Sequence, residues 1–209
     1  MTGIVQVVGT GPGNPAYITP LALQTIRSAE VLVGGGRLLD TFAEREQIQV
    51  IIKQDLAGIV SYLQKERFNK KIVVLVSGDT GIFSFADYLL KNMDREVLEF
   101  IPGVSSLQLM FARLKRSWVE AQILSMHGRC MDLAAEVVRH YPLTALLTGT
   151  PWSPQKIASH LLSQDLPDLM VAVGKDLSYT EERIEFFTLK ALACESRDFN
   201  NSIMVIFNE

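Results

Sequence analysis

Short apolar runs alternate with segments of helical periodicity through the first half of the chain. The run IVVLV at Ile72–Val76 is apolar at every position, as expected for a parallel strand that helices cover on both faces. Such alternation predicts βαβ units and a doubly wound sheet. The expected strands are Ile4–Val8, Val31–Val33, Gln49–Ile52, Ile72–Val76 and Val97–Ile101, and the expected helices are Pro20–Ala29, Leu38–Ala43, Leu56–Lys65, Phe83–Lys91 and Ser106–Leu114.

The second half of the chain has a different pattern, with more strands and fewer helices. Helices are expected at Leu133–His140 and Pro154–Leu162, and none is expected after Leu169, where strands follow one another. Consecutive strands without a crossover helix pair as hairpins, so this sheet should be mixed. We therefore predict two α/β domains, 1–120 with a mostly parallel sheet and 121–209 with a mixed sheet, and an active-site cleft between them. The expected strands lie in AQILSMHG (121–128), TALLTG (144–149), DLMVAVG (168–174), RIEFFTLKALA (183–193) and SIMVIFN (202–208).

Composition narrows the class of protein. Hydrophobic residues make up 48% of the 209 positions, charged residues 21%, and the formal net charge is −3, which is ordinary for a globular enzyme and unlike a general nucleic-acid binder. Cys130 and Cys194 stand far apart without a CxxC pair, which argues against structural zinc and indicates a reduced, cytoplasmic compartment. No apolar run approaches the roughly 20 residues that span a bilayer, and no secretory signal is visible.

The first glycine-rich loop, VVGTGPGN at Val7–Asn14, raises the question of phosphate binding. A dinucleotide fingerprint needs G-x-G-x-x-G leading directly into a helix, and an acidic residue after the second strand. Here Asn14 stands at the third glycine position, and Pro12 and Pro15 lack the N–H donors that a phosphate would need. These residues argue against a dinucleotide site, while a tight turn without a ligand stays an alternative.

Three further loops with glycine follow predicted strands. They are SGDTGIFS (77–84), IPGVSS (101–106) and HGR (127–129). Each loop alone is readily explained as a turn. In open α/β sheets, however, ligands bind beyond the carboxyl ends of the strands, so the four loops together favour a ligand site.

The ordered motifs GTGPGNPAYIT, SGDTGIFS, IPGVSSLQLMFARL and SMHGR resemble those of the tetrapyrrole methylase family. Trp118, Ala121 and Ser125, which precede His127–Arg129, resemble the branch that methylates C5 of a corrin precursor. The resemblance runs from Gly9 to the last strand. It implies the two-domain α/β fold of that family, S-adenosylmethionine as methyl donor, and a homodimer.

The resemblance also implies a substrate and a pathway. The acceptor would be cobalt-precorrin-6B or its metal-free counterpart in cobalamin biosynthesis, with any cobalt carried by the substrate and no metal ligands on the protein. A separate C15-methyltransferase and decarboxylase would cooperate with this chain. Methylases of other ring carbons, of diphthamide or of ribosomal RNA, a donor-binding module without catalysis, and a nicotinamide-dependent dehydrogenase stay open as alternatives.

Site residues carry over from the family motifs. Asp79 would either recognise the donor or order its loop, with an Asx-turn or a helix N-cap as the alternative. Thr80 replaces a proline of many relatives, which would make that loop less rigid. The implied donor contacts are Gly78, Asp79, Gly81, Ile82, Ser105 and Ser106, with Leu147, Thr148 and Met204 from the second domain, and the implied substrate contacts are Gly11, Pro12, Gly13, Asn14, Arg37, Pro102 and Gly103.

The proposed chemistry asks little of the side chains. A sulfonium donor is already activated, so the protein needs neither a nucleophile nor a metal, and its main task is to position the acceptor carbon. The catalytic candidates are His127, as a proton acceptor or substrate hydrogen-bonding group, and Arg129, as a partner for a substrate carboxylate. A structural role for His127 beside the glycine turn is the alternative. We expect a locally positive trough despite the acidic net charge.

Overall fold

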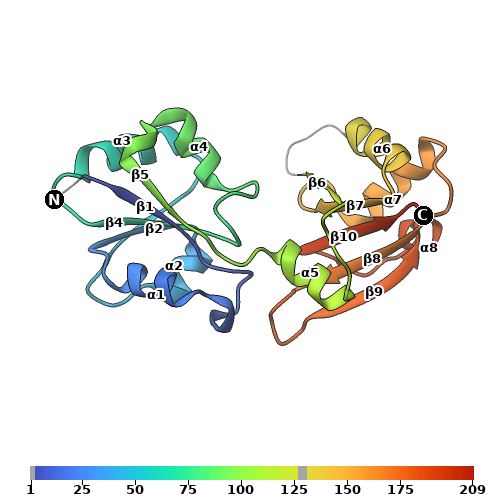
Figure 1. Cartoon of the computed structure of the whole chain (residues 1–209), viewed down its shortest axis with the longest axis horizontal. Coiled ribbons are helices and arrows are strands. Elements are labelled where there is room, and N and C mark those ends of the chain that lie inside the picture. The colour runs from blue at the N-terminus through green and yellow to red at the C-terminus, as the bar shows by residue number, and fades with distance from the viewer. Residues whose placement is uncertain (1–2, 127–130) are drawn as a thin grey trace. The chain divides into compact units, whose positions relative to one another are not determined.

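The computed structural model describes residues 3–126 and 131–209 and divides the chain into two compact units, Met1–Ser105 and Ser106–Glu209. Each unit contains one five-stranded sheet (Figure 1). The sequence pattern changes only near 117–122, but helix α5 (Ser106–Leu114) already belongs to the second unit. The reason is its packing, because the Met110 sulfur lies 2.5 Å from the place where a Cβ on Gly174 would stand.

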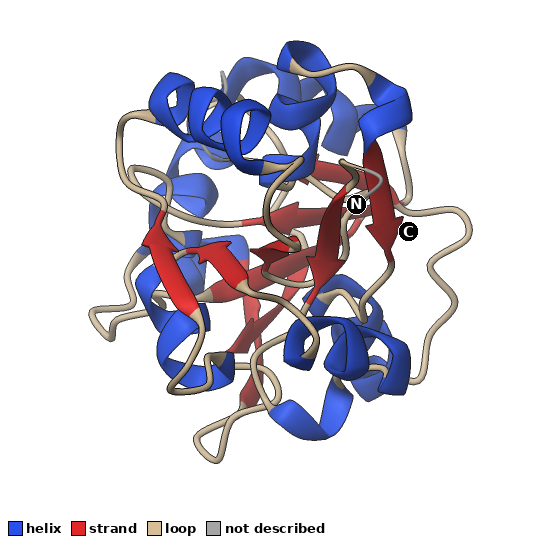
Figure 2. Ribbon diagram, turned by 90° about the vertical axis from the view of Figure 1, so that its left-hand side faces the viewer, coloured by secondary structure: helices blue, strands red, loops and turns tan. Residues whose placement is uncertain are grey.

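The first unit is a parallel sheet with strand order β3-β2-β4-β1-β5. Figure 2 shows its strands enclosed by helices. The strands are β1 (Val5–Gly9), β2 (Val31–Gly34), β3 (Ile48–Ile51), β4 (Ile72–Val76) and β5 (Leu98–Ile101). The helices are α1 (Pro20–Arg27), α2 (Gly36–Phe42), α3 (Leu56–Glu66) and α4 (Phe85–Asn92), with short 3-10 helices η1 (Pro15–Tyr17) and η2 (Arg95–Val97).

Strand β4 explains why its sequence is apolar at every position. Val74 packs into the cluster formed with α3 and α4, whereas Val73 packs into the cluster formed with α1 and α2. Successive residues of a strand point to opposite faces, so a strand covered on both faces needs apolar residues throughout. The prediction of a doubly wound parallel sheet is confirmed.

The second unit is a mixed sheet with strand order β6-β7-β10-β8-β9. Strands β6 and β7 are parallel, and the other three neighbouring pairs are antiparallel, which confirms the predicted mixed sheet. The strands are β6 (Gln122–Ser125), β7 (Leu143–Leu147), β8 (Met170–Lys175), β9 (Arg183–Thr188) and β10 (Ser202–Phe207), and the remaining helices are α6 (Met131–His140), α7 (Pro154–Ser163) and α8 (Leu189–Ala193).

Helix α8 corrects one expectation. The sequence pattern predicts no helix after Leu169 and a strand over the whole of 183–193, which is wrong for the last five residues. Thr188 ends the strand, and its hydroxyl accepts a hydrogen bond from the Ala191 amide at 3.2 Å as the helix N-cap. Leu189 and Leu192 are then fully buried in the core of the second unit.

The described residues, 3–126 and 131–209, include no helix of sufficient length and hydrophobicity to cross a bilayer.

One buried hydroxyl of the second core generates a stability prediction. Thr144 on β7 is 1% exposed, and its Oγ1 has no hydrogen-bond partner among the described residues. An unsatisfied buried polar group costs about 1–3 kcal/mol, so Thr144→Val should raise the free energy of unfolding by about 1 kcal/mol in urea denaturation. Thr188→Val, which removes the α8 cap, should instead lower it by about 1 kcal/mol. A loss of stability in Thr144→Val would contradict the assignment of an unsatisfied hydroxyl.

Candidate functional site

Three of the predicted site loops follow three neighbouring strands. Strands β4, β1 and β5 are adjacent and parallel, so their carboxyl ends meet at one edge of the first sheet. We name the segments that follow them the β1 loop (10–14), the β4 loop (77–84) and the β5 loop (102–105). The three loops carry all the predicted site residues of this unit except Arg37.

The β1 and β4 loops are hydrogen-bonded to each other through glycine backbone. The Gly11 amide donates to the Gly78 carbonyl at 3.2 Å, and the Gly78 amide donates to the Gly11 carbonyl at 2.8 Å. Both glycines have positive φ, +82° and +71°, a conformation that side-chain-bearing residues rarely adopt. A residue predicted to contact substrate is therefore linked directly to one predicted to contact donor, and both amides are used within the protein.

The β5 loop lies at backbone distance from the β4 loop and from Gly9, the last residue of strand β1. A Cβ on Gly103 would stand 2.6 Å from the Gly9 carbonyl oxygen and closer still to the Gly78 carbonyl oxygen. A Cβ on Gly9 would stand 2.6 Å from the Gly103 nitrogen. Because these obstacles are backbone atoms and not flexible side chains, the three loops can pack in this way only with glycine at both positions.

The carboxylate of Asp79 bonds to two loops at once. Its Oδ1 accepts a hydrogen bond from the Gly81 amide at 2.8 Å, which is an Asx-turn within the β4 loop. Its Oδ2 accepts one from the Gly103 amide at 3.1 Å, in the β5 loop. The Asx-turn that the sequence analysis gave as the structural alternative for Asp79 is therefore present, and the bond from Gly103 adds a link between the β4 and β5 loops.

The position that departs from the family pattern is well packed. Thr80 is 5% exposed, and its carbonyl accepts a hydrogen bond from the Ser84 hydroxyl at 2.7 Å. The same hydroxyl accepts from the Ala86 amide at 3.1 Å and caps helix α4. The β4 loop is therefore anchored to the helix that follows it.

The other predicted residues of this edge differ in exposure. Pro12 is buried, and the Asn14 side chain accepts a hydrogen bond from the Ala16 amide at 2.9 Å, so it caps the 3-10 helix η1. Ser105 is 3% exposed, and Pro102 is exposed. The partly exposed members are Gly13, Ile82 and Ser106, the last of which begins α5 in the second unit, while Gly81 is exposed.

The geometry of the β1 loop disfavours a dinucleotide site. Helix α1 begins only at Pro20, after residues 10–19 and the 3-10 helix η1, so the glycines do not lead directly into a helix N-terminus. The Gly11 amide is already bonded to Gly78 and is not free to bind a phosphate. This agrees with the argument from Pro12 and Pro15.

Arg37 lies beside a more open part of the same edge. It is exposed in the first turn of α2, just after β2. A Cβ on Gly35 or Gly36 would meet no heavy atom within 4 Å. The backbone before Arg37 therefore borders open space, in contrast to the tightly packed β1, β4 and β5 loops.

In the second unit, the predicted donor residues Leu147 and Thr148 lie at the carboxyl end of β7. The Thr148 hydroxyl donates to the Ser202 carbonyl at 2.6 Å, and the Ser202 hydroxyl donates to the Phe199 carbonyl at 2.6 Å. Thr148 and Ser202 are 7% and 6% exposed. No local sequence pattern predicts this hydroxyl pair, because it depends on the antiparallel pairing of β7 with β10 across 54 residues.

Met204 is less suited to a ligand contact than Leu147 and Thr148. Its side chain is 0% exposed and belongs to the core of the second unit. Its backbone lies between Leu146 of β7 and Val173 of β8 in the centre of the sheet. The side chain of Met204 could reach a ligand only if this core opened.

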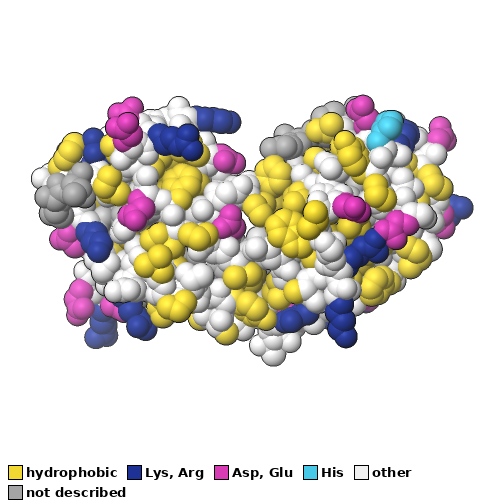
Figure 3. All heavy atoms as spheres, viewed as in Figure 1, with side chains coloured by type: hydrophobic (Ala, Val, Ile, Leu, Met, Phe, Trp, Pro, Cys, Tyr) yellow, Lys and Arg dark blue, Asp and Glu magenta, His cyan; other side chains and the backbone are white. Residues whose placement is uncertain are grey.

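The catalytic candidates His127 and Arg129 lie outside the described residues, and their roles stay predictions. The expected positive trough also stays a prediction. Figure 3 shows positive and negative side chains interspersed over the visible face of each unit.

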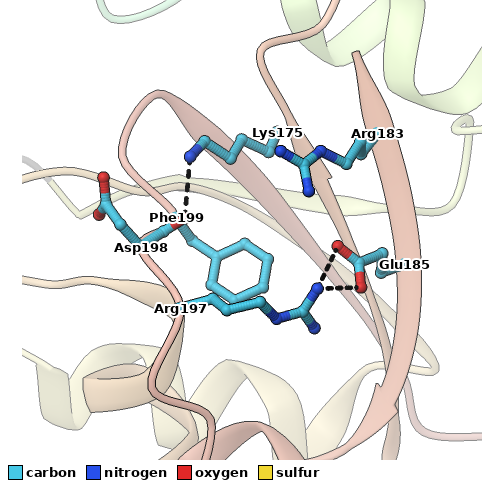
Figure 4. Close-up of a pocket in the computed structure, with 6 residues that line it drawn as sticks. All are labelled: Lys175, Arg183, Glu185, Arg197, Asp198 and Phe199. Carbon is cyan, nitrogen blue, oxygen red and sulfur yellow. Dashed lines mark hydrogen bonds and ion pairs between the residues drawn. The ribbon is translucent and has the colours of Figure 1, made fainter. Parts of the chain in front are cut away.

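A surface pocket of the second unit contains none of the predicted site residues. It is lined by Lys175, Arg183, Glu185, Arg197, Asp198 and Phe199 (Figure 4). The Arg197 guanidinium pairs with Glu185 at 2.9 Å and with Glu195 at 2.7 Å, and the Lys175 ammonium donates to the Asp198 carbonyl at 2.9 Å. The hydrogen bond from Arg197 lowers the pKa of Glu195 to about 2, and the same pairing raises the pKa of Arg197.

The chain forms two α/β units, and the first has glycine loops at the carboxyl ends of parallel strands, where open α/β sheets commonly bind ligands. The family described as Tetrapyrrole (Corrin/Porphyrin) Methylases matches residues 5–193. The chain belongs to this family and is a methyltransferase.

Relatives of full length carry one activity in their names. The chain is 28% identical to the cobalt-precorrin-7 C(5)-methyltransferase of Salmonella typhimurium, over 99% of this chain and 100% of that protein. It is 30% identical to a probable cobalt-precorrin-7 C(5)-methyltransferase of Methanocaldococcus jannaschii, over 91% of this chain and 92% of that protein.

Solved structures confirm the fold. A precorrin-6Y methylase from Archaeoglobus fulgidus superposes with a TM-score of 0.75 at 19% identity, over 99% of both chains. A uroporphyrin-III C-methyl transferase from Thermus thermophilus, solved in complex with S-adenyl homocysteine, gives a TM-score of 0.78 at 22% identity, over 98% of this chain and 97% of that one.

The close approach of the loops predicts a large effect of one methyl group. Gly103→Ala should lower the free energy of unfolding by about 1–3 kcal/mol, since the new Cβ would overlap backbone atoms of two other loops. Gly36→Ala is the matched control, because its Cβ meets no atom within 4 Å and the position is helical, and it should leave stability unchanged or slightly higher. Chemical denaturation of both variants decides the matter, and equal stability of the two would refute the packing described.

The ion pairs of the pocket predict a titration shift. Arg197→Ala should raise the pKa of Glu195 from about 2 towards its ordinary value of 4.5, as followed by carboxyl NMR signals. In the unmodified protein the pair favours the folded state above the ordinary pKa, and this contribution is lost as the pH falls through about 2. Arg183→Ala, which removes a neighbouring cation with no acidic partner among the described residues, should leave the Glu195 titration nearly unchanged.

Proposed function

We propose that this chain transfers a methyl group from S-adenosylmethionine to C5 of a cobalt-corrin precursor in cobalamin biosynthesis. The observation that carries the proposal is the joining of the β1, β4 and β5 loops at one sheet edge in a chain that matches C5-methyltransferases over its whole length. These loops hold the motifs on which the resemblance to this branch rests.

The residues at this sheet edge are better suited to binding an uncharged surface by shape than to binding a phosphate group. Gly11 and Gly78 have their amides engaged, and Pro12 has none to offer. The groups proposed to receive the donor are the remaining backbone of the β4 loop, Ile82, and the hydroxyls of Ser105 and Ser106. In the second unit the hydroxyl and the amide of Thr148 both donate to the Ser202 carbonyl, and the Leu147 carbonyl accepts from the Met126 amide. We therefore assign donor contact there to the remaining backbone of Leu147 and Thr148.

The proposed reaction depends more on the alignment of the reacting atoms than on reactive side chains. The sulfonium donor supplies an activated methyl group: the carbon–sulfur bond breaks with its electron pair left on sulfur, the new bond forms to the ring carbon, and a proton is lost from the ring. Holding the reacting atoms in line can supply about 7–11 kcal/mol of the barrier in well-oriented systems. Fixed loops of the kind seen at this edge provide such orientation, and we propose His127 as the acceptor of the proton.

The corrin precursor that accepts the methyl group is proposed from the names of the relatives. The sequence analysis expected cobalt-precorrin-6B, whereas the names of the two full-length relatives specify cobalt-precorrin-7. We therefore propose cobalt-precorrin-7, with the cobalt belonging to the substrate, and keep cobalt-precorrin-6B as the comparison acceptor. Arg129 and Arg37 are proposed to pair with its peripheral carboxylates. Homodimerisation, a cytoplasmic location and cooperation with a separate C15-methyltransferase stay predictions.

A mass spectrum tests the reaction. Incubation with S-adenosylmethionine carrying a ¹³C-methyl group and cobalt-precorrin-7 should add one labelled methyl group to the corrinoid, at C5 by NMR. Methylation of cobalt-precorrin-6B alone would correct the acceptor, and methylation at another ring carbon would move the chain to another branch of the family.

Two binding outcomes would overturn the proposal. Calorimetry should detect binding of S-adenosylhomocysteine, and binding without methyl transfer to any purified corrinoid would instead support a non-catalytic module. Tight binding of NADH without binding of S-adenosylhomocysteine would support a dehydrogenase.

A further inference from the structure

We infer that Asp79 is a positioning residue, whose carboxylate sets the spacing between the β4 and β5 loops and so shapes the donor site without touching the donor. The effect on donor binding rests on the proposed function, whereas the link between the two loops does not. The two hydrogen bonds from Gly81 and Gly103 to the two carboxylate oxygens carry it.

The position of Gly103 makes this link important. Pro102 has no N–H, so the Gly103 amide is the first donor of the chain after strand β5. That amide donates to Asp79, 24 residues earlier in the chain. Two residues later comes Ser105, 3% exposed, one of the residues assigned to the donor. A change at the Asp79 carboxylate would therefore act on the first backbone amide of the β5 loop.

Only a carboxylate of this length satisfies both loops. A carboxylate offers two acceptor oxygens, whereas asparagine offers one oxygen and one amide donor. Since the Gly81 bond closes a local Asx-turn, an asparagine should keep that bond and direct its N–H groups at the Gly103 amide. Serine could form the local turn, but its shorter side chain would not span to the neighbouring loop.

Close backbone packing makes the spacing sensitive. A Cβ on Gly103 would overlap both Gly9 and Gly78, so the β5 loop already lies at the closest approach that glycine allows. Loss of the attraction from Asp79 can therefore only move the loop outward. Such a movement displaces Ser105 relative to Gly78, whose Cβ position lies 3.7 Å from the Ser105 Cα.

The experiment compares two readouts in Asp79→Asn. Residue-resolved amide hydrogen exchange should show Gly103 exchanging about tenfold faster with Gly81 little changed, and calorimetry should show S-adenosylhomocysteine bound about tenfold more weakly, the effect of losing a hydrogen bond to a charged group. Asp79→Ser should give the same two changes and serves if the asparagine variant fails to fold.

Asp55→Ala is the control for a loss of stability alone. Asp55 accepts a hydrogen bond from the Gly58 amide at 2.8 Å and caps α3 in the same unit, but it belongs to none of the three loops. This variant should lose stability because the cap is removed, as Asp79→Asn does through its lost bond, while its affinity for S-adenosylhomocysteine stays unchanged. A purely structural role of Asp79 predicts the same behaviour for both variants and would overturn the inference.

The outcomes separate the inference from the proposed function. Weaker binding in Asp79→Asn with unchanged Gly103 exchange would mean direct contact with the donor and would overturn the positioning role. If the unmodified protein binds no S-adenosylhomocysteine, the proposed function fails. The exchange of Gly103 then still decides whether Asp79 links the two loops.

Discussion

The first unit depends on backbone-to-backbone contact between three loops at one sheet edge. Parallel pairing of β4, β1 and β5 brings the loop starts together, and glycine at Gly9 and Gly103 lets the backbones approach to a distance that any side chain would prevent. Gly78 contributes in another way, because its φ of +71° is rarely adopted by residues with a side chain. The paired bonds between Gly11 and Gly78 then fix the register of two of these loops. Glycine here serves packing of the protein against itself, and the absence of phosphate-binding geometry follows from the same contacts.

In both units, polar side chains of the predicted donor segments form hydrogen bonds within the protein. Asp79 uses both carboxylate oxygens on backbone amides, and Thr148 uses its hydroxyl on the Ser202 carbonyl. Neither side chain is then available as a simple ligand. Backbone that internal hydrogen bonds already hold in place loses little further conformational entropy when ligands bind. This arrangement suits a reaction in which the donor is already activated and the protein supplies orientation.

Much of the fold could be predicted from the sequence, because the signals were local. The run Ile72–Val76 was placed to the residue, since apolar positions on both faces fit only a covered parallel strand. Helix α8 was missed because aromatic alternation continues into LKALA without a glycine or proline between them, and only the Thr188 cap marks the change. The Asp79–Gly103 and Thr148–Ser202 bonds join residues 24 and 54 positions apart, so no local pattern could indicate them.

The pocket of the second unit and the three glycine loops differ in how they carry charge. Of its two arginines, Arg197 is paired with Glu185 and Glu195, whereas Arg183 has no acidic partner among the described residues. Its lysine is bonded to a main-chain carbonyl, so only part of the positive charge is left without a partner. The β1, β4 and β5 loops carry a single ionisable side chain on their joined face, Asp79, which is itself satisfied. The proposed donor site therefore depends on the packing of the glycine loops and not on a concentration of charged side chains.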